Sequence, residues 1–479
     1  MNTKFLNKLT FLYLIIPTII FLIGWCKLYL SIPISIALII IYFKRYKLEK
    51  AEVKEIVKSI KKNKKKILIV LGIILFYVFI SGIGGYVYQN DDHAYRNGIF
   101  ETLVNNKWPV VYDKLSTFKG QIMLVYYFAF WLPAAVIGKL FGLTTGYFFL
   151  YLWAVIGVSI VFAYLMKYFK KNYLIPILIF VTFSGLDILE NFFHGRDALA
   201  LINSTAHLEW ITNSQMSSFT TQLFWVFNQA IPAWLLTFCI LNEEDNRILG
   251  VLLALSLIFC TLPAVGLIFV AFYKVFFTDV NILKLIKVKD KFIKWLKNIF
   301  TWENILVGIP LLLICALFVK SNIAGSNISF VFKGFEILNI LISIIFEVLI
   351  YYIVIYKYQN KSPLYYISLI SLIICPLLSI NGKGDFCMRA SIPGLIMLLI
   401  LIFQSLEKAM EKNDKTFIKI LATLLIIGSL TPINEVKRTI ANTHKNTVLE
   451  RYDLVISPCK NNFFGYTKDN LFYKYIARK

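Results

Sequence analysis

Apolar residues occur in membrane-length runs along nearly the whole chain. A run of about 20 apolar residues can cross the hydrocarbon core of a bilayer as a helix, and only helices or closed barrels satisfy the backbone there. The ten-residue alternating segments that are typical of a barrel are missing from the sequence. The pattern predicts an all-α transmembrane bundle of about thirteen spans, at residues 4–24, 27–43, 66–85, 144–166, 172–187, 220–240, 247–261, 263–277, 303–320, 334–356, 363–379, 390–405 and 416–432.

For two apolar segments, the sequence allows more than one path through the membrane. Residues 120–138 are long enough to span, but a full crossing would place the basic block "KYFKKN" (167–172) outside. We therefore expect an interfacial or re-entrant helix there, because the Lys/Arg bias then holds at nearly every short inner loop. Residues 247–277 are interrupted by Pro263, and the lysine-rich segment after them leads us to expect a short helical hairpin, with one tilted helix as the alternative.

The lysine blocks set the expected orientation. With the amino terminus inside, residues 1–432 form the bundle, residues 86–143 and 188–219 form two outer loops, and residues 433–479 form an extracytoplasmic tail. The end of that tail, residues 461–479, is aromatic and basic, which suits a segment that lies on lipid headgroups. All four histidines fall on the outer side, which indicates that function resides there.

Composition supports the membrane class. The 479 residues are 58% hydrophobic and 16% charged, and the mean hydropathy is +0.69, far above the range of soluble domains. The net charge of +23 comes from blocks between apolar runs, such as "FKRYKLEKAEVKEIVKSIKKNKKK" (43–66), so we expect membrane lipids and not nucleic acid as partners. The seven cysteines form no Cys-x-x-Cys pair and read as buried hydrophobes.

The first outer loop holds an acid pair. Residues 91–105 are predicted to form an amphipathic helix on the membrane surface, beginning at Asp91 and Asp92. One acid would suffice to cap the helix. Two acids also suit a general base that deprotonates an acceptor hydroxyl, or a site for a divalent cation such as Mg or Mn. Neighbouring side chains would then contact the substrate: His93, Arg96 and Asn97.

A second polar cluster lies at the outer mouth of a late span, in "NGKGDFCMRASIPGL" (381–395). Lys383, Asp385 and Arg389 concentrate charge there, and Arg fits a phosphate through two parallel hydrogen bonds. We expect these residues to bind a lipid-phosphate leaving group. The alternative is a snorkelling arginine beside a weak surface ion pair.

Two further segments are candidates for the lining of the site. In "FTTQLFWVFNQAIPAWLL" (219–236), Gln222, Trp225 and Gln229 share one helical face and either hold helices together or line a sugar site. The loop 187–210, which contains His194, is predicted to be a lid or an acceptor surface. Its spacing matches no metal signature, so we assign no metal ligand.

An acid pair in the first large outer loop, then "YYFAFWLPAAVIGKLFG" (126–142), a span ending "AYLMKYFKKNYLIPILIF" (163–180) and a polar outer loop resemble the GT-C superfamily of polytopic glycosyltransferases. The layout is similar to that of the aminoarabinose and protein O-mannosyl transferases over roughly residues 66–190. The resemblance implies an essential acid on a surface-lying helix and a second surface helix that ends in an "LFG"-like turn. The chain departs from those families by the hairpin at 4–43, and "STFKGQ" (116–121) replaces their His-Pro-Pro signature.

The expected function is that of an integral-membrane glycosyltransferase at the outer face of a bacterial cytoplasmic membrane. The donor would be a polyprenyl-phosphate-linked sugar, and the acceptor a glycan, lipid or protein. Asp91 or Asp92 would be the base, and Arg389, helped by Lys383 and Arg96, would stabilise the departing phosphate. No cofactor is required, and a divalent metal stays an open alternative. The other functions we consider are a polysaccharide polymerase or ligase and a lipid-linked glycan transporter or flippase.

Overall fold

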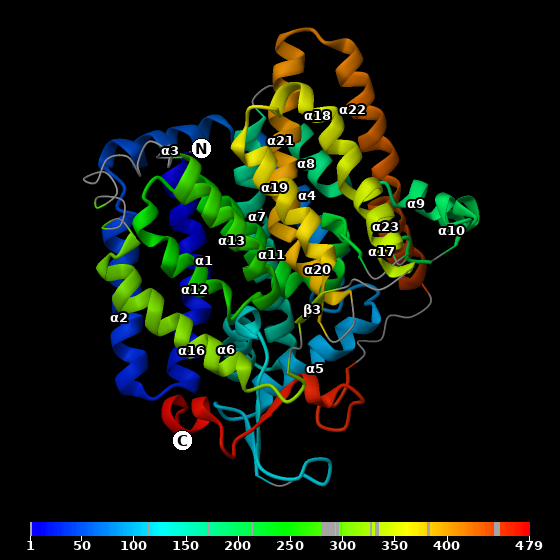
Figure 1. Cartoon of the computed structure of the whole chain (residues 1–479). Helices are drawn as coiled ribbons and strands as arrows, with labels where there is room; N and C mark the ends of the chain where they lie inside the picture. The colour runs from blue at the N-terminus through cyan, green and yellow to red at the C-terminus, as the bar shows by residue number, and fades with distance from the viewer. Residues whose placement is uncertain are drawn as a thin grey trace.

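A computed structural model shows a mostly helical protein (Figure 1). It describes residues 2–278 without 114, 170, 171, 205, 210, 212 and 213; residues 293, 297 and 299–444 without 326, 327, 331–334 and 381–383; and residues 451–479. The helical bundle is confirmed. The described residues also contain five short strands, which the hydropathy pattern did not predict because each strand is only two or three residues long.

Residues 3–79 form four helices: α1 (Thr3–Trp25), α2 (Leu28–Arg45), α3 (Lys50–Lys62) and α4 (Lys64–Phe79). Helices α1 and α2 pack against each other as a hairpin. Helix α3 is basic and crosses the end of the bundle beside the N-terminus (Figure 1).

The first predicted outer loop folds into α5 (Asp91–Asn105), β1 (Val111–Tyr112), β2 (Ile122–Leu124), the turn η1 (Ala129–Trp131) and α6 (Leu132–Phe141). Residues 120–138 therefore contain a strand and the start of a short helix. They do not form one continuous membrane-length helix, which agrees with the expectation that this segment does not cross fully.

The central part of the chain contains the most buried helix. Its elements are α7 (Leu143–Tyr168), α8 (Leu174–Thr182), α9 (Asp187–Phe193), α10 (Ala198–Asn203), α11 (Phe219–Asn242), η2 (Asn246–Ile248), α12 (Leu249–Ser256), α13 (Thr261–Tyr273) and η3 (Lys274–Thr278). Every residue of α11 from Phe219 to Ile240 is buried, and the helix packs against α1, α7, α13 and α21. The predicted break within 247–277 is confirmed, since the chain leaves the helix between α12 and α13.

The last part of the chain completes the bundle. Its elements are η4 (Asn304–Gly308), α16 (Ile309–Lys320), β3 (Ile328–Phe330), α17 (Phe335–Ile344), η5 (Ile345–Leu349), α18 (Ile350–Gln359), α19 (Pro363–Ile374), η6 (Cys375–Leu377), β4 (Leu378–Ile380), α20 (Asp385–Ala390), α21 (Ile392–Glu411), α22 (Lys415–Gly428), α23 (Leu430–Thr443), η7 (Lys460–Asn462), β5 (Phe464–Tyr466) and η8 (Phe472–Ile476). Helix α23 runs across residue 432, so the bundle and the predicted tail share one helix.

Among the described residues, eight helical segments are long and apolar enough to cross a membrane: Thr3–Trp25, Leu28–Arg45, Leu143–Tyr168, Leu174–Phe193, Phe219–Asn242, Ile337–Gln359, Ile392–Glu411 and Lys415–Thr443. Five shorter apolar helical segments accompany them: Ala129–Phe141, Asn246–Ser256, Thr261–Phe277, Asn304–Lys320 and Pro363–Leu377. The helices indicate a multi-pass membrane protein, and the number of thirteen spans stays a prediction.

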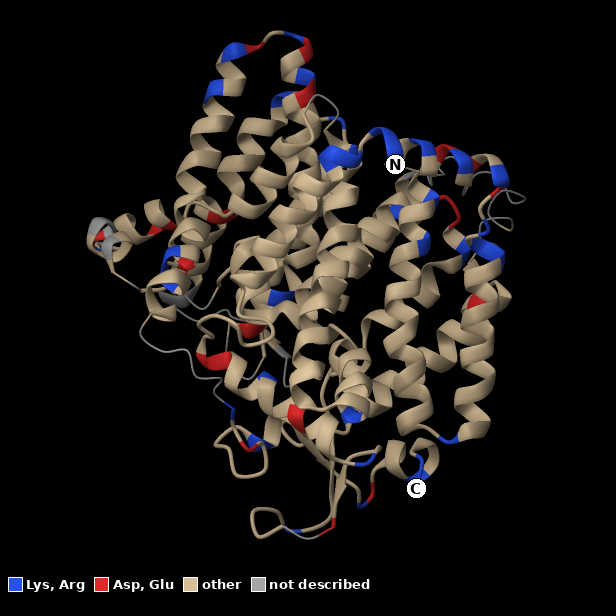
Figure 2. Ribbon diagram, turned by 180° about the vertical axis from the view of Figure 1, so that it is seen from behind, with Lys and Arg blue, Asp and Glu red and all other residues tan. Residues whose placement is uncertain are grey.

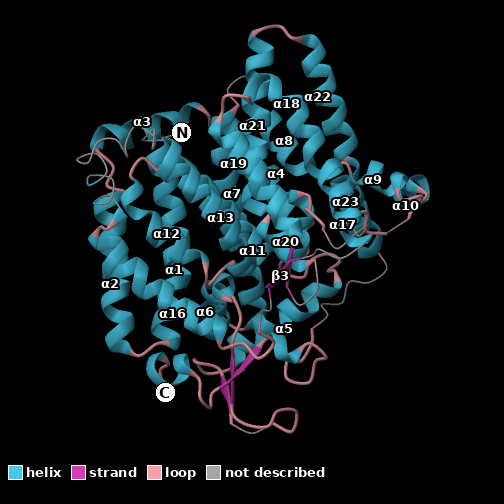
Figure 3. Ribbon diagram, viewed as in Figure 1, coloured by secondary structure: helices cyan, strands magenta, loops and turns pink. Residues whose placement is uncertain are grey.

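The C-terminal segment folds back onto the protein. Strand β5 pairs antiparallel with β2, with Met123 opposite Gly465, and β1 completes this three-stranded sheet. Near the end of the chain, Ala477 forms a bridge with Cys26 between α1 and α2. This sheet lies at the end of the molecule that carries the C-terminus (Figure 3). Strands β3 and β4 form a second, two-stranded sheet.

The two termini lie at opposite ends of the bundle (Figure 1). Lys and Arg gather at the end that carries the N-terminus, on α3 and on the turn between α21 and α22 (Figure 2). This distribution is the one expected if the N-terminal end faces the cytoplasm.

Candidate functional site

Helix α5 is anchored through its first turn to a break in α11. Val226 of α11 has non-helical dihedral angles (φ −135°, ψ 35°), and a helix break leaves carbonyl groups without intrahelical donors. The carbonyl oxygen of Phe224 accepts hydrogen bonds from Asn90 Nδ2 and from His93 Nε2, each at 2.8 Å. The residues beside the acid pair are therefore held in place by the most buried helix of the protein.

His93 uses both ring nitrogens in protein contacts. Its Nδ1 lies 3.2 Å from Gln89 Nε2, and its Nε2 faces the Phe224 carbonyl. Burial, together with the charge of Arg96, lowers the pKa of His93 to about 3. A neutral imidazole that donates from Nε2 and accepts at Nδ1 satisfies both contacts. Asn97 donates to the same Gln89 at 2.9 Å, so both predicted substrate contacts are used to orient α5.

Arg96 lies inside the protein. Its side chain is only 6% exposed, and Nη2 donates to Asp92 Oδ2 at 2.9 Å. Nε and Nη1 are buried without a hydrogen-bond partner among the described residues, and the guanidinium stands over the ring of Phe227. Helix α5 begins at the predicted residue, and its placement on the membrane surface stays a prediction, but the expected exposed polar face is wrong. Arg96, Asn97 and the apolar side of α5 are all buried, because the segment at Tyr452 covers the helix.

Asp91 and Asp92 occupy the first turn of α5. The Asp92 side chain is 42% exposed although it pairs with Arg96. Asp91 is also exposed, and its carboxylate makes no hydrogen bond or ion pair with any described residue. The acid pair thus presents one oriented and one free carboxylate at the surface.

A second acid and arginine, on α20, repeat this arrangement. Arg389 Nη1 donates to Asp385 Oδ1 at 2.6 Å, and the side chains are 10% and 59% exposed, respectively. Arg389 Nε is buried without a partner among the described residues. Burial acts to lower the pKa of Arg389, but the charge of Asp385 and the neighbouring tyrosines raise it overall. Lys383, the third predicted member, lies outside the described residues.

Tyr126 lies within the electrostatic influence of both arginines. Partial burial raises the pKa of its phenol, and the positive charges of both Arg96 and Arg389 act in the opposite direction. Its ring lies against that of Tyr127, with centroids 3.8 Å apart. Arg96 of the first loop and Arg389 of α20, separated by almost 300 residues, therefore both act electrostatically on Tyr126. The sequence offered no signal for Tyr126, because it stands in an apolar segment.

The predicted polar face of α11 divides into two groups. Gln222 is fully used within the protein, since its Oε1 accepts from Trp234 Nε1 and its Nε2 donates to the Ser217 carbonyl, both at 2.8 Å. Asn228 and Gln229, which follow the break, are 1% exposed, and neither carboxamide has a partner among the described residues. Gln222 stabilises the bundle, whereas Asn228 and Gln229 retain free hydrogen-bonding capacity.

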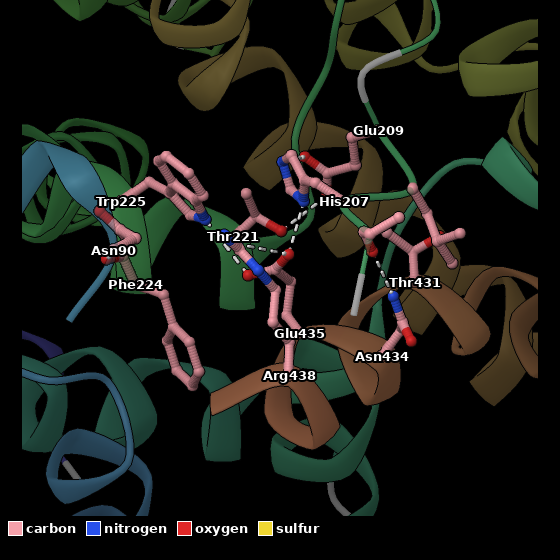
Figure 4. A network of polar contacts seen from close by, with 12 residues as sticks. Asn90, His207, Glu209, Thr221, Phe224, Trp225, Thr431, Asn434, Glu435 and Arg438 are labelled. Carbon is pink, nitrogen blue, oxygen red and sulfur yellow. Dashed lines mark hydrogen bonds and ion pairs between the residues drawn. The ribbon is translucent and has the colours of Figure 1, made fainter. Parts of the chain in front are cut away.

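Trp225 joins a network that the sequence did not predict (Figure 4). Its Nε1 donates to Glu435 Oε2 at 3.2 Å, and its ring stacks on His207 with centroids 5.2 Å apart. His207 Nδ1 lies 2.5 Å from Glu435 Oε1. Arg438 covers the indole at 5.1 Å. Glu435 and Arg438 lie on α23, in residues that were expected to be a tail outside the bundle.

The same network holds the second predicted outer loop. Glu209 Oε1 accepts from the Ser218 amide at 2.9 Å and from Thr221 Oγ1 at 2.7 Å. Burial acts to lower the pKa of His207, but the hydrogen bond to Glu435 and its charge raise it overall. Burial also raises the pKa of Glu209. The second predicted outer loop is thus fixed to α11 through Glu209 and to α23 through His207. The Glu435 carboxylate stabilises the protonated form of the His207 imidazole.

His194 stands apart from these groups, at the end of α9, with Nε2 3.9 Å from Glu190 Oε1. Among the residues that the structure describes, no three or more His, Cys, Asp or Glu side chains gather closely enough to hold a metal ion. The seven cysteines are all free.

Comparisons with models of protein families, with curated proteins and with solved structures found no match to this chain.

Proposed function

We propose that the protein is a polytopic membrane glycosyltransferase that moves a sugar from a polyprenyl-phosphate donor to a hydroxyl acceptor. The observation that carries this proposal is the pair of buried guanidinium groups of Arg96 and Arg389, whose positive charges both act on Tyr126. Both guanidinium groups are buried and keep N–H groups without partners among the described residues. Buried donors of this kind fit a phosphate, which accepts several charge-assisted hydrogen bonds.

The carboxylate next to these arginines supplies the second half of the chemistry. In the proposed step, Asp92 takes the proton of the acceptor hydroxyl, and the hydroxyl oxygen forms a bond to the anomeric carbon of the sugar. The bond between that carbon and the phosphate oxygen breaks, and its electron pair leaves with the phosphate. Arg96 and Arg389 stabilise the charge that develops on this leaving group.

Asp92 is the preferred base because Arg96 fixes its orientation at 2.9 Å. Asp91, exposed and without a partner among the described residues, is the alternative base. The apolar bundle provides the surroundings for the prenyl chain, and a glycan, lipid or protein would be the acceptor. We place the site on the outer face of a bacterial cytoplasmic membrane, supported by the gathering of Lys and Arg at the opposite end (Figure 2).

The test separates binding from chemistry. Purified wild-type protein and the variants Asp92→Asn, Asp91→Asn and Arg389→Lys are incubated with lipid-linked sugars extracted from cells that lack the protein, and release of prenyl phosphate is measured. Asp92→Asn should lower transfer by about 10²–10⁴-fold and leave the binding of a prenyl phosphate unchanged. Asp414→Asn, which removes a carboxylate paired with Lys357 on the turn before α22, is the matched control. Undiminished transfer in the Asp91→Asn, Asp92→Asn double variant would exclude the base.

A second candidate function is a transporter or flippase for a lipid-linked glycan. The observation that favours it is the burial of Asp187 and Glu347 within apolar helical segments, where ionisable residues often mark a transport pathway. A flippase would keep its transport activity in Asp92→Asn. Loss of sugar transfer in that variant therefore distinguishes the two.

A further inference from the structure

A pair of buried carboxyl groups lies away from the acid pair of α5. Asp187 begins α9 and is 0% exposed, and Glu347, in η5, is 4% exposed. The two carboxyl groups are neighbours, because Glu347 Oε2 lies against Gly185, two residues before Asp187, and the Leu186 amide donates to the Phe346 carbonyl at 3.1 Å. Asp187 Oδ1 and Glu347 Oε2 each have no hydrogen-bond donor among the described residues. Two carboxylate oxygens cannot face each other out of water without a positive charge between them.

The other carboxylate oxygen of Asp187 is already satisfied. Oδ2 accepts from Ser184 Oγ at 2.7 Å and from Thr431 Oγ1 at 2.8 Å. These two hydroxyl groups fix the carboxylate, so that Oδ1 remains available to a further ligand. Glu347 is fixed by close packing, because a Cβ on Gly185 would lie 1.8 Å from Oε2. The pair is therefore held together by the fold and cannot separate by rotation into solvent.

A third buried oxygen without a donor lies on the same helix as Asp187. Asn191, one helical turn after Asp187, is 0% exposed and donates from Nδ2 to the carbonyls of Asp187 and Leu208, at 2.8 and 2.9 Å. Its Oδ1 has no donor among the described residues. Asp187 Oδ1, Asn191 Oδ1 and Glu347 Oε2 are thus three buried oxygens without a hydrogen-bond donor among the described residues. Each of them could be satisfied by a cation.

Other acidic side chains add negative charge around the pair of Asp187 and Glu347. The groups that bear most strongly on Glu347 are Asp187, Glu190 and Glu209, all acidic. The nearby cations are engaged elsewhere: His207 pairs with Glu435, and Arg196 acts on Glu190. The phenol of Tyr351 faces the pair as a neutral group and donates to the Ser184 carbonyl at 3.0 Å.

We propose that Asp187 and Glu347, with Asn191, form a binding site for one monovalent cation, which is either a proton shared by the two carboxyl groups or Na⁺. The described residues offer too few carboxylate ligands here for a divalent ion. Because Thr431 of α23 holds Asp187, the occupied site ties α9 and η5 to α23. This inference does not depend on the proposed transfer reaction.

The first measurement uses the wild-type protein in detergent. Binding of radioactive sodium is measured at constant ionic strength with choline as the replacement ion, and infrared spectra record the carbonyl stretch of protonated carboxyl groups at neutral pH. If the cation is Na⁺, one ion binds per chain and protons compete with it. If the cation is a proton, no sodium binds, and a protonated-carboxyl band is present.

The variants Asp187→Asn and Glu347→Gln assign the signal. Each removes one negative charge and keeps the size of the side chain, so each should weaken sodium binding by at least about tenfold, or remove the infrared band. Asp414→Asn, which replaces an acid paired with Lys357 at 2.5 Å on the surface, should change neither signal. The proposal would be overturned if the wild-type protein binds no sodium and shows no protonated-carboxyl band. It would also be overturned if the signal seen in the wild-type protein is unchanged in Glu347→Gln.

Discussion

His93 Nε2 lies 2.8 Å from the carbonyl oxygen of Phe224, two residues before the break in α11. This contact joins the helix that carries the acid pair to the most buried helix of the bundle. Together with Asn90 Nδ2, His93 also supplies hydrogen-bond donors to a carbonyl beside the break in α11. The position of Asp92 therefore depends on an imidazole that need not touch substrate.

Replacing His93 tests this anchor. His93→Leu removes one of the two donors to the Phe224 carbonyl, while Asn90 Nδ2 remains, and should lower the free energy of unfolding by about 0.5–1.5 kcal/mol, the net contribution of one hydrogen bond. The loss should be largest at neutral and alkaline pH and should shrink as the pH falls below about 6.5, because the pKa of His93 is lowered to about 3 in the folded protein and the unfolded chain therefore binds the proton first. Unfolding curves in detergent at several pH values measure it. His444→Leu, at an exposed position, should stay within about 0.5 kcal/mol of wild type.

Replacing Arg389 tests the phosphate site. Arg389→Lys keeps the positive charge and loses the planar donor set, so the affinity for a short prenyl phosphate should fall by about tenfold or more. Titration calorimetry on detergent-solubilised protein measures the affinity. Arg451→Lys, an exposed arginine paired with Glu101 at 2.9 Å, is the control and should bind as wild type does. Equal affinity in the two variants would remove Arg389 from the site.

Adding a methyl group to Gly98 tests the cover over α5. A Cβ at this position would lie 2.3 Å from the carbonyl oxygen of Tyr452. The backbone N–H of Tyr452 donates to the Ala94 carbonyl at 3.0 Å. Gly98→Ala should cost about 1–3 kcal/mol through overpacking and should increase hydrogen exchange around residues 451–455. Gly72→Ala on α4, which has no neighbour within 4 Å, should leave exchange in that segment unchanged. Normal protection in Gly98→Ala would show that the segment does not cover the helix.

Replacing His207 tests the clasp between the second outer loop and α23. The pKa of His207 is raised from its ordinary value of 6.5 in the folded protein. Its stabilisation is therefore fully present below that value and is lost as the pH rises through the higher folded-state value. His207→Gln should reduce the melting temperature most at mildly acidic pH, with a smaller deficit at alkaline pH. Scanning calorimetry from mildly acidic to alkaline pH measures the melting temperatures of the two proteins. A melting-temperature deficit of His207→Gln that grows with pH would contradict the prediction.

The sequence by itself determined the elements whose causes are local. The apolar runs predicted the helices because a bilayer permits few other structures. The start of α5 at Asp91 and the break between α12 and α13 followed from an acid pair after a span and from a proline in an apolar run. These features depend on residues within a few turns of one another, so a single chain is enough to read them.

Only the tertiary structure decided which polar groups meet. Arg96 was expected on a wet helix face and is buried, and the residue on which the charges of Arg96 and Arg389 both act is Tyr126, in an apolar segment. Glu435 was placed in a tail, yet it bonds to His207 across 228 positions. Strand β5 and the acid pair of Asp187 and Glu347 likewise depend on distant segments. Helical periodicity states which face of a helix is apolar, but the partner of a polar side chain is set by long-range packing, which leaves no periodic trace in the sequence.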